Sequence, residues 1–113
     1  MPKSLRTFIQ DCQRELPGEV IHITKEVNPA NYDVTAIIKH LGAQKKFPII
    51  IFDKPLNLNG KVGPIKLTMN CEISQGKAQI ALGMPKTSTR PEMAEKCLEM
   101  EEHRIPPTIV DKK

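Results

Sequence analysis

The spacing of apolar residues near the start of the chain predicts an amphipathic helix. Ser4 is a favourable N-cap residue. The apolar residues that follow it recur at intervals of three and four, as on one face of a helix: Leu5, Phe8, Ile9, Cys12 and Leu16. Pro17 and Gly18 then end the pattern. We therefore expect a first helix that buries Cys12.

The next segment has the pattern of two strands separated by a helix. Val20–Thr24 is rich in β-branched residues and predicts a strand, with His22 on the face opposite its two isoleucines. Asn31–Leu41 has helical periodicity, and Gly42 stands where a left-handed cap is expected. The continuous apolar run Pro48–Phe52 predicts a central strand covered on both faces. A helical crossover between two strands favours parallel pairing.

The second half of the chain predicts a loop, a short strand and two helices. Residues 53–64 are rich in Pro, Asn and Gly, as in an exposed loop or hairpin. Ile65–Met69 alternates apolar and polar residues, which predicts a strand with one wet face. Ser74–Leu82 is expected to be helical, and Gly83 stops it.

The last helix is predicted from the capping-box spacing of Thr89 and Glu92. Its expected inner face consists of Met93, Ala94, Cys97 and Leu98. The other side is acidic, and Lys96 lies four residues after Glu92, a spacing that predicts an ion pair. A solvated face explains the acidic side most simply, and an interface for a basic partner is the alternative. Pro106 and Pro107 are expected to end the helix.

Length and composition limit the fold class. The chain has 113 residues, of which 39% are hydrophobic and 27% charged, as in an ordinary globular domain. We therefore predict one small α/β domain, a mixed sheet of about three strands flanked by helices. Residues 1–105 would form the domain, and residues 106–113 an extended tail or a linker toward a catalytic domain that follows.

Composition also argues against several functional classes. No apolar run approaches the roughly 20 residues that span a bilayer, and the start lacks a signal peptide, so we expect a cytoplasmic protein without membrane contact. Three widely spaced cysteines suit neither a disulfide framework nor a zinc site. The net charge of +4 comes from scattered residues, with only Lys45-Lys46 and Lys112-Lys113 adjacent. A nucleic-acid binder is therefore the least favoured function.

Few side chains are candidates for chemistry, and each has a simpler structural interpretation. His22 could be a catalytic base, but a surface histidine with hydrogen-bond partners is more common. His40 and His103 fall near helix C-termini, where a cationic ring interacts favourably with the helix dipole. Cys71 has no histidine near it in the sequence and is interpreted as structural, and Cys12 and Cys97 as core thiols.

One glycine-rich segment resembles a phosphate-binding loop only superficially. Gly60–Gly63 lacks both the full Walker pattern and its strand-to-helix context. We therefore predict no catalytic, cofactor-binding or metal-binding residue in this chain.

Several short strings nonetheless resemble a known family in the order in which they occur. Leu5–Ile9 (LRTFI) is similar to an opening "L-R-x-F-I/L" helix, and Val20–Pro29 to "L-x-x-I-x-x-x-V-D/N-P". Pro48–Phe52 takes the place of "P-A-L-L-F", and Asn70–Met84 fits "N-L-x-x-S-R-x-R-x-A-x-A-L-G-M". Pro106–Val110 is similar to "P-P-x-x-V". Together these strings resemble the N-terminal domain of the UbiD-type decarboxylases, among them the ferulic acid decarboxylases.

The resemblance implies a function for a larger assembly. UbiD-type enzymes decarboxylate aromatic and α,β-unsaturated acids with prenylated flavin mononucleotide and a metal ion. Their cofactor-binding and catalytic residues belong to the domain after this one. By resemblance, this chain is a non-catalytic N-terminal portion that binds no cofactor alone, and its partner is the remainder of the decarboxylase. The sequence departs from the family at Gln75 and Lys77, where the family has arginines.

Two arrangements of that partner stay open. The catalytic region could continue the same polypeptide, so that this chain is a piece of one enzyme. It could also be encoded separately, so that this chain is a stand-alone non-catalytic subunit. The sequence from Met1 to the polar residues after the two prolines is compatible with a subunit that ends at a domain boundary.

Overall fold

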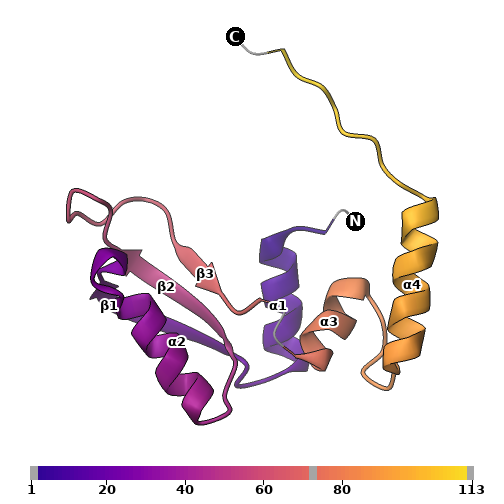
Figure 1. Ribbon diagram of the computed structural model, residues 1–113, viewed down its shortest axis with the longest axis horizontal. Helices are drawn as coiled ribbons and strands as arrows, with labels where there is room; N and C mark the ends of the chain where they lie inside the picture. The colour runs from indigo at the N-terminus through magenta and orange to yellow at the C-terminus, as the bar shows by residue number, and fades with distance from the viewer. Residues whose placement is uncertain (1–2, 72–73, 112–113) are drawn as a thin grey trace.

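The apolar run before Asp53 forms the middle strand of a three-stranded sheet. The computed structural model describes residues 3–71 and 74–111. Its strands lie in the order β1-β2-β3, with β1 parallel to β2 and β3 antiparallel to β2. The elements follow one another as in Figure 1: α1 (Leu5–Glu15), β1 (Val20–Val27), η1 (Pro29–Asn31), α2 (Asp33–Ala43), β2 (Ile49–Pro55), β3 (Leu67–Met69), α3 (Gln75–Leu82) and α4 (Arg90–Glu102). The predicted α/β class, element order and parallel pairing of the first two strands are confirmed.

Both faces of β2 are covered, as its continuous apolar sequence predicts. Ile50 and Phe52 point to a core shared with α2, which also contains Val27 and Val34. The alternate residues of β2 point the other way and form a second cluster with Cys12 of α1: Ile49 and Ile51. All four apolar residues of β2 are at most 7% exposed. The sheet therefore lies between α2 on one face and α1, with Ile80 of α3, on the other.

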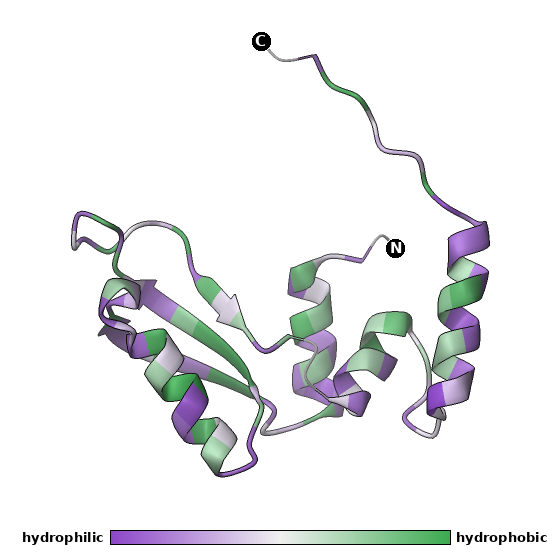
Figure 2. Cartoon of the chain, in the orientation of Figure 1, coloured by the Kyte–Doolittle hydropathy of each residue, from purple (hydrophilic) through white to green (hydrophobic). Residues whose placement is uncertain are grey.

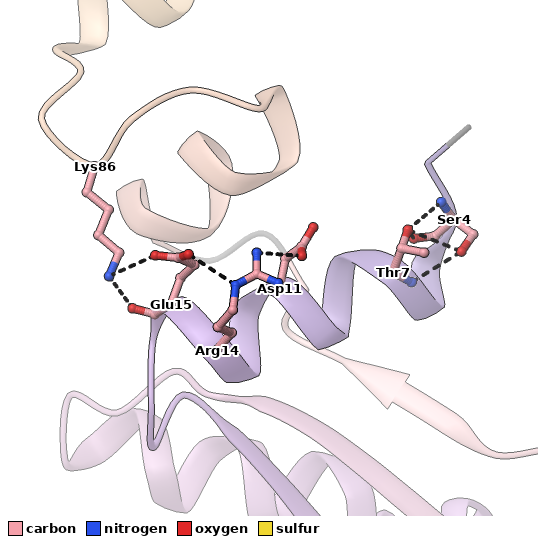
Figure 3. Close-up of polar contacts among 6 residues, drawn as sticks. All are labelled: Ser4, Thr7, Asp11, Arg14, Glu15 and Lys86. Atoms are coloured by element: carbon pink, nitrogen blue, oxygen red, sulfur yellow. Dashed lines mark hydrogen bonds and ion pairs between the residues drawn. The ribbon is translucent and has the colours of Figure 1, made fainter. Parts of the chain in front are cut away.

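The first helix begins where its N-cap residue predicts. Ser4 and Thr7 form a reciprocal capping box, in which the Thr7 amide donates to Ser4 Oγ at 3.2 Å and the Ser4 amide to Thr7 Oγ1 at 2.9 Å (Figure 3). These bonds satisfy amides that the first turn leaves without helical partners. Cys12 is fully buried, as expected.

The predicted boundaries of the second helix are wrong at both ends. Pro29–Asn31 forms a separate 3₁₀ turn, capped by the Asn28 side chain, and α2 begins only at Asp33. At the other end Gly42 lies inside the helix and is not a left-handed cap. The left-handed conformation falls instead on Lys45, with φ of 56°, because the chain continues helical hydrogen bonding to the carbonyls of Leu41 and Gly42.

The third predicted helix is confirmed, including its stop. Ser74 caps the Lys77 amide at 3.2 Å, and Gly83 adopts φ of 70° at the C-cap. Gly76 lies in the first turn, where a Cβ atom would come within 3.3 Å of Leu16 Cδ1. The glycine thus lowers helix propensity by about 1 kcal/mol while permitting α3 to approach the end of α1 closely.

Candidate functional site

The base of α4 is fixed to the rest of the fold by polar contacts. Gln79, only 3% exposed, donates its side-chain amide to the Ser88 carbonyl at 2.8 Å, and Gln75 reaches the same oxygen at 3.3 Å. Thr89 and Glu92 then form the predicted capping box. The start of α4 is therefore held in one place relative to α3.

A second anchor joins this connection to α1. The Lys86 ammonium donates to the Glu15 carbonyl and lies 3.6 Å from the Glu15 carboxylate (Figure 3). Arg14 bridges Glu15 and Asp11, at 3.2 and 2.8 Å. These pairs are exposed and individually weak. Together with the Gln79 contact they orient the segment from which α4 emerges.

The body of α4, in contrast, packs little against the chain. None of its residues, all of which are described, is buried. Leu98 and Met100 are 65% and 51% exposed, and Cys97 is exposed. Figure 1 shows α4 standing at the end of the molecule far from the sheet, beside α3. The predicted inner face is thus wrong as a core face, because Ala94, Cys97 and Leu98 are exposed and Met93 is only half-buried.

The segment after α4 extends the exposed apolar surface. The helix ends at Glu102 with His103 as its C-cap, before the two prolines that were expected to end it. The extended tail carries Ile105, Ile109 and Val110, which are 92%, 91% and 78% exposed. Figure 2 shows apolar residues on α4 and along this tail. We call the α4 residues Cys97, Leu98 and Met100 with these three tail residues the α4–tail surface.

The charged side of α4 is solvated but paired differently from the prediction. The Glu92 carboxylate accepts from the Thr89 amide at 2.9 Å, so it serves the cap. Lys96 pairs with Glu99 at 3.6 Å instead. The predicted Glu92–Lys96 pair is therefore wrong, because the capping bond holds Glu92 at the helix start.

Lys77 lies at a junction that sequence reasoning missed. Its side chain is fully buried, although lysine is almost never fully buried without a partner. The ammonium donates to the carbonyl of Phe47, just before β2, and to that of Asn70, just after β3, at 3.4 Å. The Glu19 carboxylate, just before β1, is 3.6 Å away. One cation thereby joins three chain connections to α3.

His22 belongs to an exposed charged cluster on the sheet. Its Nδ1 lies 3.4 Å from Asp53 Oδ1, and Lys66 Nζ lies 3.2 Å from the same oxygen. The hydrogen bond from Lys66 is the main cause of a lowered pKa for the Asp53 carboxyl, and His22 adds to it. The interpretation of His22 as a surface histidine with a hydrogen-bond partner is confirmed.

The other histidines lie where the sequence placed them, near helix ends. His103 caps α4, and its Nδ1 is 3.1 Å from the Glu99 carbonyl. His40 lies in the last turn of α2, with Nε2 3.1 Å from the Gln44 amide nitrogen. Gly60 to Gly63 lies in the turn between β2 and β3, away from any helix start, in agreement with the rejection of a phosphate loop.

The three cysteines lie in different environments. Cys12 is fully buried, and Cys71 packs against the same cluster. Cys97 is exposed, so its assignment as a core thiol is wrong. Burial raises the pKa of the Cys12 thiol, which keeps it in its unreactive protonated form.

We therefore expect a maleimide to label Cys97 in the folded protein while Cys12 stays protected. Peptide mass spectrometry after timed labelling measures both rates, and labelling in denaturant is the control in which both residues react. Equal labelling of Cys12 and Cys97 in the folded state would contradict their placement.

Residues 3–71 and 74–111 contain no group of three or more His, Cys, Asp or Glu side chains placed to hold a metal ion. Within the same ranges, no helix has both the length and the apolar character needed to cross a membrane. Comparison of the chain with family models, with curated proteins and with solved structures found no match.

Proposed function

We propose that this chain is the N-terminal, non-catalytic portion of a cytoplasmic UbiD-like decarboxylase and that it acts by packing against the catalytic polypeptide. That polypeptide would hold the prenylated flavin and the metal ion. The observation that carries the proposal is the α4–tail surface, whose apolar side chains are exposed although the base of α4 is fixed.

The energetics of this surface favour a partner. Burying a large aliphatic side chain contributes about 1.5–3 kcal/mol. Leu98, Ile105 and Ile109 gain little of this stabilisation within the chain, because each residue is more than half exposed. Large exposed apolar patches are typical of interaction surfaces.

The resemblance indicates which partner this is. Pro106–Val110 is similar to the segment that leads into the catalytic domain of UbiD-type enzymes, and its Ile109 and Val110 are 91% and 78% exposed. The same segment therefore has the family's linker pattern and the exposure that a docking segment needs. Both features favour the remainder of the decarboxylase as the polypeptide that covers it.

The experiment combines the purified chain with the UbiD-type catalytic polypeptide encoded in the same genome. We expect the isolated chain neither to retain prenylated flavin nor to release carbon dioxide from aromatic or α,β-unsaturated acids, and the two polypeptides to co-elute from a sizing column. Carbon dioxide release by the isolated chain, or failure of the two to associate, would contradict the proposal. The downstream reading frame separates one continuous enzyme from two subunits.

A further inference from the structure

A groove of about 470 Å³ lies between α1 and the part of the sheet that α1 leaves open. It is independent of the α4–tail surface, because its lining comes from the first helix and all three strand regions. Its apolar lining residues are all aliphatic: Leu5, Ile9 and Ile51. Its polar lining residues are Arg6, Gln13, His22, Lys66 and Thr68.

Strand register explains why these polar side chains gather on one face. His22 pairs with Ile51 across β1 and β2, and Thr68 pairs with Ile51 across β2 and β3. The three residues therefore form one row on the side of the sheet that α1 covers. Leu5 is 54% exposed at the open end of the groove, so an apolar surface lies next to the charged row.

The charges around the groove leave a net attraction for anions. Asp53 Oδ1 is 3.2 Å from Lys66 Nζ and 3.4 Å from His22 Nδ1, so its negative charge is matched within the chain. Arg6 forms no ion pair with any residue of the described ranges. Its guanidinium offers fixed donors that suit a carboxylate, and His22 lines the same groove.

We propose that this groove binds a carboxylate carried on an aliphatic chain. Arg6 donates to the carboxylate, and the aliphatic floor of Leu5, Ile9 and Ile51 covers the chain. The volume is within the range of small-molecule sites, which bury apolar bodies and orient them with a few polar groups. The apolar part of the lining consists of Leu5, Ile9 and Ile51, which offer aliphatic contacts to a hydrocarbon chain.

The test is a titration of the full chain with octanoate, octanol and acetate, followed by NMR shifts at Leu5, Ile51 and Thr68. Octanoate is expected to saturate these shifts at concentrations at least about tenfold lower than octanol or acetate, because only octanoate offers both the charge and the chain. Equal midpoints for octanoate and octanol, or no saturable shift at these three residues, would overturn the proposal.

Arg6→Gln is the informative variant, because Arg6 is exposed and makes no ion pair that the fold requires. It should weaken octanoate binding about tenfold and leave octanol binding unchanged. Lys61→Gln, on the turn between β2 and β3 and outside the groove lining, is the matched control and should bind as the unaltered chain does. Unchanged octanoate binding by Arg6→Gln would exclude the assigned carboxylate contact.

Discussion

Phe52→Ala is expected to lower the free energy of unfolding by about 3–5 kcal/mol. Phe52 is fully buried on the middle strand, between Ile23 of β1 and Leu67 of β3, and it packs in the α2-facing core. Truncation removes its apolar contacts and leaves a cavity. The cavity cannot close easily, because β2 is hydrogen-bonded to a strand on each side. Because a small domain has only about 5–15 kcal/mol in total, the variant should be close to unfolding.

Urea unfolding followed by circular dichroism measures this loss. Leu58→Ala is the matched control, because Leu58 is 99% exposed on the turn after β2 and should change stability by less than about 0.5 kcal/mol. A loss below about 1 kcal/mol for Phe52→Ala would mean that this residue is not at the centre of the core.

Lys77→Met should destabilise the fold by about 2 kcal/mol, although methionine keeps most of the side-chain volume. The substitution removes the donor shared by the carbonyls of Phe47 and Asn70 and leaves both without that donor. It also leaves the Glu19 carboxylate without its cation. Replacing a whole buried polar set by apolar groups can be neutral, but removing one member alone is costly.

Chemical unfolding compares Lys77→Met with Lys61→Met, an exposed lysine-to-methionine change on the β2–β3 turn. The control should alter stability by less than about 0.5 kcal/mol. Hydrogen exchange should also rise at the start of α3 and next to Phe47 in the Lys77 variant. Wild-type stability of Lys77→Met would show that the junction does not hold these connections together.

Local signals were enough to predict most elements of the fold. Ser4, Ser74 and Thr89 each cap the helix that follows, because a side-chain oxygen at these positions accepts a backbone amide bond whatever the tertiary context. The apolar run of β2 predicted burial on both faces, since such a run has no polar side to expose. The prediction that Gly42 ends α2 was wrong because a glycine can adopt the left-handed cap conformation but does not require it. Helical hydrogen bonding continues past Gly42.

The candidate surfaces were harder to predict from the sequence. Periodicity predicted an inner face for α4 at Met93, Ala94, Cys97 and Leu98, but it could not show whether anything covers these residues. The burial of Lys77 depends on three connections that meet only after folding, so no local pattern reports it. The Asp53–Lys66 pair depends on the register between β2 and β3. The length of the loop between these strands did not determine that register.

The most direct test of the account is the affinity of the chain for the UbiD-type catalytic polypeptide after Leu98→Asp. Leu98 is 65% exposed in α4, so the fold and its melting temperature should not change, while a charge in the buried interface should weaken binding by tenfold or more. Leu58→Asp should bind as the unaltered chain does, because Leu58 lies on the turn between β2 and β3, which Figure 1 shows at the other end of the fold from α4. Calorimetric titration of both variants would contradict the account if Leu98→Asp bound the catalytic polypeptide as tightly as the unaltered chain.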